Sequence, residues 1–136
     1  MTARRSEKAI QNDTLVELSA LEGGMFWRNN TGQGWVGKRV EARVGSTIKV
    51  TQDMVILTAA RPITFGLPGS ADILGAYRGV PCAVEIKAAN GRQSQQQKAF
   101  ETVWTRAGGL YVLARSPAEA VDGLSHFSGN LTEFGV

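Results

Sequence analysis

The chain has 136 residues, of which 43% are hydrophobic and 20% charged, with a formal net charge of +3. This length predicts one globular domain spanning residues 1–136, and the basic balance mildly favours a polyanionic partner. The single cysteine, Cys82, excludes an intramolecular disulfide and a thiolate metal cluster. No apolar run follows the basic N-terminus, so we expect neither a signal peptide nor a membrane span, and a cytoplasmic protein.

Residues 6–21 are predicted to form the first helix, which Gly23-Gly24 ends. Ser6 is placed to cap this helix. Glu7 lies in its first turn, where a carboxylate interacts favourably with the helix dipole. This local role is enough to explain Glu7 without a catalytic function.

The next part of the chain is predicted to be extended. Residues 25–28 form a short strand and residues 29–34 a flexible loop. We then expect residues 38–44 to pair with residues 47–50 across a turn at Gly45-Ser46. Further edge strands are expected at residues 54–57 and 63–65.

This β-rich part contains the most basic local patch of the sequence. Its cations are Lys38, Arg39, Arg43 and Lys49. Three interpretations are open: an arm that contacts phosphates, an arm that mediates dimerisation, or a solvated hairpin.

Two apolar strands are predicted at residues 71–77 and 80–88, separated by the turn-prone Arg78-Gly79. Each contains an acid, Asp72 in the first and Glu85 in the second. If the strands pair as a hairpin, the two carboxylates can lie side by side.

Lys87 follows Glu85 by two residues, so both side chains face the same way, about 6.5–7 Å apart along the strand. Together with Asp72 they can form a site for a divalent cation. Mg²⁺ takes one or two carboxylates and leaves other positions to water and substrate phosphate. The alternative is a solvated strand edge, where a Glu-x-Lys pair is common.

A second helix is predicted from Ser94 to about Arg106, with Ala99, Phe100, Val103 and Trp104 as its buried face. Ser94 and Gln97 form a Ser-x-x-Gln capping box, which alone can explain both residues. A strand at residues 110–114 and a helix from Ser116-Pro117 to about Leu124 follow. This order predicts a mixed α/β or α+β domain with a central mixed sheet flanked by helices.

Three segments resemble the virus-type replication-repair nuclease domain (VRR-NUC) of the PD-(D/E)XK nuclease superfamily. They are Gly69-Ser70-Ala71-Asp72, Glu85-Ile86-Lys87 and Gly91-Arg92-Gln93-Ser94-Gln95-Gln96-Gln97. Ala71 replaces the proline of the superfamily's name, which shapes a turn and does no chemistry. The resemblance covers most of the chain apart from roughly residues 37–61 and the tail. It implies a restriction-endonuclease-like core.

The resemblance implies catalytic roles for Glu7, Asp72, Glu85, Lys87 and Gln97. Asp72, Glu85 and the main-chain carbonyl of Ile86 would hold Mg²⁺ or Mn²⁺, with Glu7 as a further candidate ligand. Lys87 would orient or activate water and stabilise the transition state, and Gln97 would help to hold Lys87 and the water. The candidate nucleic-acid contacts are Arg28, Asn29, Lys38, Arg39, Arg43, Ser70 and Arg92. Arg28 and Asn29 have bracing of the site as an alternative role.

The expected function is that of a metal-dependent DNA endonuclease acting on branched DNA, such as a Holliday junction, in replication, recombination or repair. Paired cuts across a junction need two sites related by a twofold axis, so we expect a homodimer. Apolar residues for an interface, or for the core, are Trp27, Trp35, Met54, Val55, Ile56 and Leu57. The alternatives are a restriction-type flap or duplex nuclease and a non-catalytic nucleic-acid-binding module.

Overall fold

The computed structural model describes residues 4–39, 44–49 and 51–130, with side chains described as far as residue 126. Contacts divide the chain into two compact units. The first, called here the core unit, consists of Met1–Asn30 and Gly66–Val136. The second, the hairpin unit, is Thr31–Phe65. No helix in the described ranges combines the length and apolar character needed to cross a bilayer.

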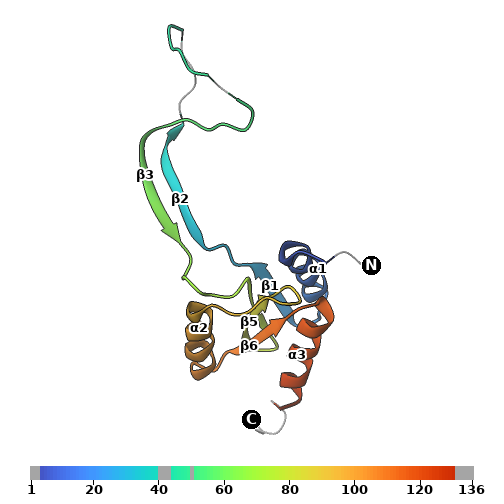
Figure 1. Ribbon diagram of the computed structural model, residues 1–136. Helices are drawn as coiled ribbons and strands as arrows, with labels where there is room; N and C mark the ends of the chain where they lie inside the picture. The colour runs from blue at the N-terminus through green and yellow to red at the C-terminus, as the bar shows by residue number, and fades with distance from the viewer. Residues whose placement is uncertain (1–3, 40–43, 50, 131–136) are drawn as a thin grey trace. The chain divides into compact units, whose positions relative to one another are not determined.

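The core unit is built on a four-stranded mixed sheet (Figure 1). In spatial order its strands are β1 (Gly24–Arg28), β4 (Ile73–Tyr77), β5 (Val80–Ile86) and β6 (Leu110–Ala114). The pairs β1–β4 and β4–β5 are antiparallel, and the pair β5–β6 is parallel.

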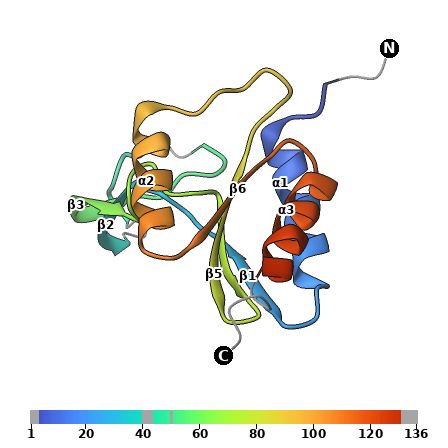
Figure 2. The ribbon, with the colours of Figure 1, turned by 90° about the horizontal axis from the view of Figure 1, so that it is seen from below.

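Three helices flank this sheet. Figure 2 shows α1 (Glu7–Ser19) and α3 (Pro117–Asn130) together on one face and α2 (Gln95–Arg106) on the other. The predicted fold class, a mixed α/β domain with a central mixed sheet between helices, is therefore confirmed.

The first helix begins where the sequence predicts. The Ser6 hydroxyl accepts a hydrogen bond from the Ala9 amide at 3.2 Å, which caps α1. Its buried residues, Ile10, Thr14 and Leu18, recur every four residues and so share one face. That face is the one that packs against the core.

The strands β4 and β5 form the predicted hairpin, with Ile73 opposite Val84. Its turn residues Arg78 and Gly79 both have positive φ, at 48° and 84°, as a tight two-residue turn between twisted strands requires. Every residue of β5 except Pro81 is buried, because the strand is central and has helices over both faces.

The second helix begins at Gln95 with the predicted capping box, but its predicted buried face is wrong. Ala99 and Val103 are exposed, and Phe100 and Trp104 are only half-buried. The two aromatic rings stack with centroids 5.4 Å apart, and the Trp104 indole donates to the Leu110 carbonyl. The helix therefore contacts β6 through a few side chains and leaves the rest of its apolar face uncovered.

The hairpin unit consists of two antiparallel strands, β2 (Gly32–Arg39) and β3 (Leu57–Phe65). The predicted pairing of residues 38–44 with 47–50 is wrong for Lys38 and Arg39, which pair with Thr58 and Leu57. Residues 40–43 and 50 lie outside the described residues.

The pairing of β2 with β3 contains an irregularity between Val36 and Lys38. Gly37 lies at this point, and a Cβ there would be 2.8 Å from the Thr58 carbonyl oxygen. Opposite it, Ala59 has a φ of 50°. The bulge explains why only glycine fits and why simple alternation does not predict the register.

Candidate active site

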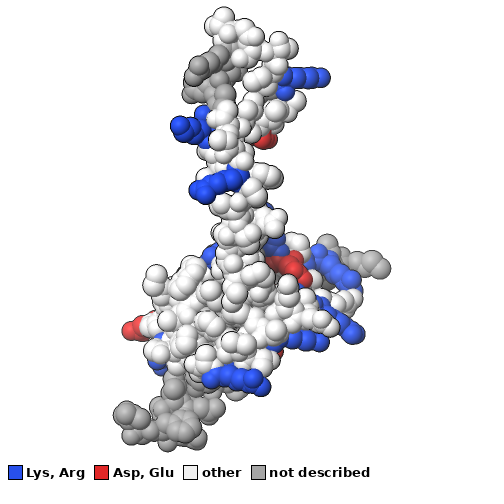
Figure 3. Space-filling view, turned by 90° about the vertical axis from the view of Figure 1, so that its left-hand side faces the viewer, with Lys and Arg blue, Asp and Glu red and all other residues white. Residues whose placement is uncertain are grey.

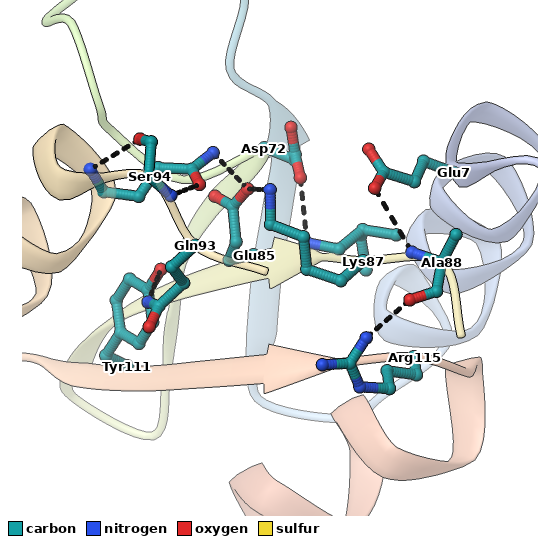
Figure 4. A network of polar contacts seen from close by, with 11 residues as sticks. Glu7, Asp72, Glu85, Lys87, Ala88, Gln93, Ser94, Tyr111 and Arg115 are labelled. Atoms are coloured by element: carbon teal, nitrogen blue, oxygen red, sulfur yellow. Dashed lines mark hydrogen bonds and ion pairs between the residues drawn. The ribbon is translucent and has the colours of Figure 1, made fainter. Parts of the chain in front are cut away.

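The β4–β5 hairpin brings Asp72 and Glu85 together at one end of the sheet (Figure 4). Asp72 directly precedes β4, and its Oδ2 accepts a hydrogen bond from the Ile86 amide at 2.8 Å. Glu85 lies inside β5 and is only 1% exposed. Lys87 follows this strand and is 8% exposed. The predicted juxtaposition of two carboxyl groups and an ammonium group is present.

Glu85 has one satisfied and one unsatisfied carboxyl oxygen. Its Oε1 accepts from Gln97 Nε2 at 2.7 Å and lies 3.4 Å from Lys87 Nζ. Its Oε2 is buried and has no hydrogen-bond partner among the described residues. An ionised oxygen left in this state is costly, so a positive charge or a proton is needed beside it.

The pKa values of both acids are raised. Burial raises the pKa of Glu85 to about 7, and the nearby Asp72 charge adds to the shift, while Lys87 opposes it. Burial also raises the pKa of Asp72, against the Ile86 hydrogen bond and the Lys87 charge. A proton on Glu85 can bond to Asp72, which contributes to the shift of Glu85. The pair is therefore suited to hold either a proton or a cation between its oxygens.

Glu7 reaches the same end of β5 from the first turn of α1. Its Oε1 accepts from the Ala88 amide at 3.2 Å, and its charge contributes to the raised pKa of Asp72. Gly91 packs against it: a Cβ there would lie 3.1 Å from Glu7 Oε1 and 3.3 Å from Lys87 Cδ. Glycine at position 91 therefore lets the loop approach both side chains closely.

Gln97 performs two structural tasks with one side chain. Its Oε1 accepts from the Ser94 amide at 2.8 Å, which completes the capping box of α2. Its Nε2 donates to Glu85 Oε1, the same oxygen that lies 3.4 Å from Lys87 Nζ, so the amide positions the carboxylate beside Lys87. The capping and the site-bracing interpretations of Gln97 are thus compatible.

The residues after Lys87 are held by an arginine that the sequence did not single out. Arg115 follows β6, and its Nη1 donates to the carbonyl oxygens of Ala88 and Ala89. The Lys87 amide itself donates to the Ala114 carbonyl at 3.0 Å. The only sequence signal was a basic residue directly after a strand, which is too common to be specific.

Gln93 precedes α2, which begins at Gln95, and so is not part of that helix. Instead Gln93 Nε2 donates to the Tyr111 hydroxyl at 3.0 Å. Burial raises the pKa of Tyr111 to about 12; the Gln93 hydrogen bond opposes this shift, and the negative charge of Glu85 adds to it. Tyr111 is a neutral neighbour of the site that the sequence did not indicate.

Two candidate nucleic-acid contacts instead brace the loop that carries Asp72. Asn29 Nδ2 donates to Ser70 Oγ at 2.7 Å and to the Ala71 carbonyl at 2.8 Å. The Asn29 amide donates to the Asp72 carbonyl, also at 2.8 Å. Asn29 therefore holds the loop that carries Asp72 against the end of β1, and Ser70 is one of the residues to which it is bonded.

The other candidate contacts are dispersed. Arg28 donates to the Asn12 side chain and so links β1 to α1. Arg92 is exposed in the loop between β5 and α2. Lys38 and Arg39 are exposed at the end of β2 in the hairpin unit, and Arg43 lies outside the described residues.

The donor set fits a hard divalent cation. It offers carboxylate oxygens from Asp72 and Glu85, and Glu7 lies at the same end of β5, where its Oε1 accepts from the Ala88 amide. Among the described residues no three His, Cys, Asp or Glu side chains converge at metal-binding distance. Two carboxylates suffice for Mg²⁺, which keeps several waters and takes substrate oxygens in its remaining positions. The buried, unpartnered Glu85 Oε2 is the strongest sign of such a ligand.

The chain matches none of the protein-family models and none of the curated proteins with which it was compared. The likeness to VRR-NUC domains therefore stays a prediction from the quoted residues. A functional assignment depends on the chemistry of the site.

Proposed function

We propose that the protein is a divalent-metal-dependent endodeoxyribonuclease that hydrolyses phosphodiester bonds. The observation that carries this proposal is the buried Glu85 Oε2, which lacks a partner among the described residues although Asp72 and Lys87 lie beside it. A structural ion pair would satisfy both carboxylate oxygens. A site that binds a cation leaves one of them free for the metal.

In this proposal Asp72, Glu85 and the Ile86 carbonyl hold Mg²⁺ or Mn²⁺. The bound ion would supply a water of lowered pKa and positive charge beside the scissile phosphate. Glu7 would be a further oxygen ligand for the ion. The Ile86 amide fixes Asp72 through the 2.8 Å hydrogen bond, so its other oxygen is the one available to the ion.

Lys87 is proposed to act on the phosphoryl group and the attacking water. Its Nζ is directed by Glu85 Oε1 at 3.4 Å, and only 11% of its side chain is exposed. An ammonium group held in this way donates to the water and to a phosphoryl oxygen, and it stabilises the charge that grows in the transition state. Gln97 keeps Glu85 in place and so acts on Lys87 indirectly.

The proposed substrate is branched DNA, and the proposed assembly is a homodimer, because paired cuts across a junction need two sites with twofold symmetry. A panel of labelled four-way junctions, flaps and plain duplexes tests the first point. Sedimentation equilibrium with and without junction DNA tests the second, because a 14.6 kDa monomer in both conditions contradicts paired cutting.

The catalytic assignment is tested with Asp72→Ala and Lys87→Ala, using Lys98→Ala on the exposed part of α2 as the control. Cleavage in Mg²⁺ or Mn²⁺ should be abolished in the first two variants, retained in the control, and absent for the wild type in EDTA. Calorimetric metal binding should weaken in Asp72→Ala and persist in Lys87→Ala. Binding of DNA without metal-dependent cleavage of any substrate by the wild type would instead identify a non-catalytic binding module.

A further inference from the structure

The hairpin unit is exposed over nearly its whole surface. Of the residues in β2 and β3, only Gly34 and Leu57 are even half-buried. Trp35 is 67% exposed, although tryptophan is normally among the better buried residues. A two-stranded hairpin without a packed face is marginally stable in water. Its surface is therefore suited to contact another molecule.

The hairpin unit also holds all of the net charge. It contains five basic residues and two acids, which gives +3, whereas the core unit contains ten of each. The described cations are Lys38, Arg39, Lys49 and Arg61. Figure 3 shows Lys and Arg side chains in blue on the face that it draws. None of these four has an ion pair or a side-chain hydrogen bond within the described ranges. Their charges are thus available to a ligand.

The strand register distributes these groups over both faces of the hairpin. Trp35 pairs with Pro62, and the adjacent pair, Val36 with Arg61, points to the opposite face. Beyond the bulge, Lys38 and Arg39 extend the basic surface at the end of β2. Cations therefore flank an aromatic residue along one narrow ribbon.

We propose that the β2–β3 hairpin is a DNA-binding arm, with its cations on backbone phosphates and Trp35 on a sugar or an exposed base. A two-stranded ribbon fits the major groove of a duplex, and phosphate contacts supply most of the affinity for DNA. This inference rests on the proposed function and deepens it, because it assigns DNA binding to the hairpin unit and hydrolysis to the core unit.

The alternative occupant is a second copy of the chain, and two features disfavour it. Protein interfaces are depleted in lysine at their centres, and two hairpins of +3 repel each other. Pro62 has no N–H to offer another strand, which weakens edge-to-edge pairing along β3. Charge complementarity therefore favours a polyanion.

The test uses the full chain and a labelled duplex in EDTA, so that binding is measured without cleavage. The hairpin variant is Arg39→Gln with Arg61→Gln. The matched control is Arg78→Gln with Arg106→Gln, two exposed arginines of the core unit. Fluorescence anisotropy over a series of salt concentrations gives the affinity and its salt dependence. Circular dichroism checks that both variants melt at the wild-type temperature.

The hairpin variant should bind roughly 50-fold more weakly at 0.1 M salt, with a salt slope smaller by about 1.8, as expected for two lost phosphate contacts. Trp35→Ala should weaken binding roughly tenfold with an unchanged slope. Equal losses in hairpin and control variants, or no loss in the hairpin variant, would overturn the proposal. The proposal would also be overturned if the hairpin variant had a lower mass than the wild type in sedimentation but the same DNA affinity. That result would identify the arm as a dimer contact. Intact DNA binding without cleavage would contradict only the nuclease assignment.

Discussion

The protein contains two antiparallel hairpins whose surroundings differ almost completely. The β4–β5 hairpin lies within the sheet of the core unit, and β5 is buried along nearly its whole length. Among the described residues β2 and β3 pair only with each other, and both strands are exposed along nearly their whole length. Both carry charged residues, but the strands of the first are mostly buried and those of the second mostly exposed.

Burial changes what a charge does in each hairpin. Glu85, at 1% exposure, has a pKa raised to about 7 and an oxygen without a partner in the described residues. Arg61 is exposed, so water and salt screen its charge, and it attracts phosphates mainly within a Debye length, about 10 Å at 0.1 M salt. The buried β4–β5 hairpin is therefore suited to hydrolysis at one phosphate. The exposed β2–β3 hairpin is suited to attracting many phosphates.

The largest expected effect is a loss of cleavage when the buried charge in the β4–β5 hairpin is removed. Glu85→Gln removes the buried carboxylate at almost constant volume, and cleavage should fall by roughly 10²-fold or more. Its free energy of unfolding without metal should change little, because the relief of the carboxylate's desolvation cost is offset by the lost pairing with the nearly buried Lys87. Cleavage assays and urea titrations measure the two quantities.

Asp53→Asn is the matched change in the hairpin unit, since Asp53 is exposed and its φ of 64° suits asparagine equally well. Cleavage by this variant should stay within about twofold of the wild type, as is usual for surface changes. A similar loss of cleavage in both variants would show that the contrast between buried and exposed charge does not govern activity.

Each hairpin contains a tightly packed glycine, and replacing it with alanine tests whether the two hairpins unfold independently. A Cβ at Gly75 would lie 2.3 Å from the Met25 carbonyl oxygen and 2.4 Å from the Phe26 ring, so Gly75→Ala should cost about 3 kcal/mol of stability. A Cβ at Gly37 meets the Thr58 carbonyl, and Gly37→Ala should disturb the β2–β3 pairing alone. Hydrogen exchange resolved by residue should show faster exchange in the core strands only for Gly75→Ala. The same pattern for Gly37→Ala would mean that the two units unfold together.

The buried hairpin also depends on α2, and two capping variants measure that dependence. Ser94→Ala and Gln97→Ala should each cost about 0.5–2 kcal/mol through loss of the cap. Only Gln97→Ala also removes the 2.7 Å hydrogen bond to Glu85, so only this variant should lose cleavage, by roughly tenfold. Equal turnover in both variants below their melting transitions would limit Gln97 to a capping role.

The smallest effect is a pH dependence of stability without added metal. Glu85 has a folded-state pKa of about 7 against an ordinary value of 4.5, so the folded protein binds the extra proton between these values. Its contribution to stability is therefore complete below about pH 4.5 and is lost as the pH rises through 7. The melting temperature should fall over this range, and Glu85→Gln should remove that part of the fall. Arg61→Gln should leave the profile unchanged.

Much of the site could be predicted from the sequence because its signals are local. The positions of Asp72, Glu85 and Lys87 follow from strand alternation and a two-residue turn, and both are short-range rules. The Ser94–Gln97 capping box is equally local, and it forms as predicted. The raised pKa values and the free oxygen of Glu85 depend on burial in three dimensions, which strand alternation alone does not give.

Two errors have physical causes. The Gly45-Ser46 turn signal favoured pairing between neighbouring segments, but β2 pairs with a distant strand, because closing a longer loop costs little extra entropy. The apolar stripe of α2 predicted a buried face, but only Phe100 and Trp104 find partial cover beside Tyr111. Periodicity shows which side of a helix is apolar and says nothing about how much surface is available to cover it.

The hydrogen bonds of Asn29 have a consequence for engineering of the chain. Residues 31–65 are inserted between Asn29 and Ser70, two residues of the core unit that are joined at 2.7 Å. The segment therefore starts and ends at two points of the core unit that are already held together by the Asn29–Ser70 hydrogen bond. Such a junction tolerates exchange of the inserted segment, as loop sites with fixed ends generally do. A short flexible linker, or a different arm, can in principle replace the hairpin while the loop of Asp72 stays in place.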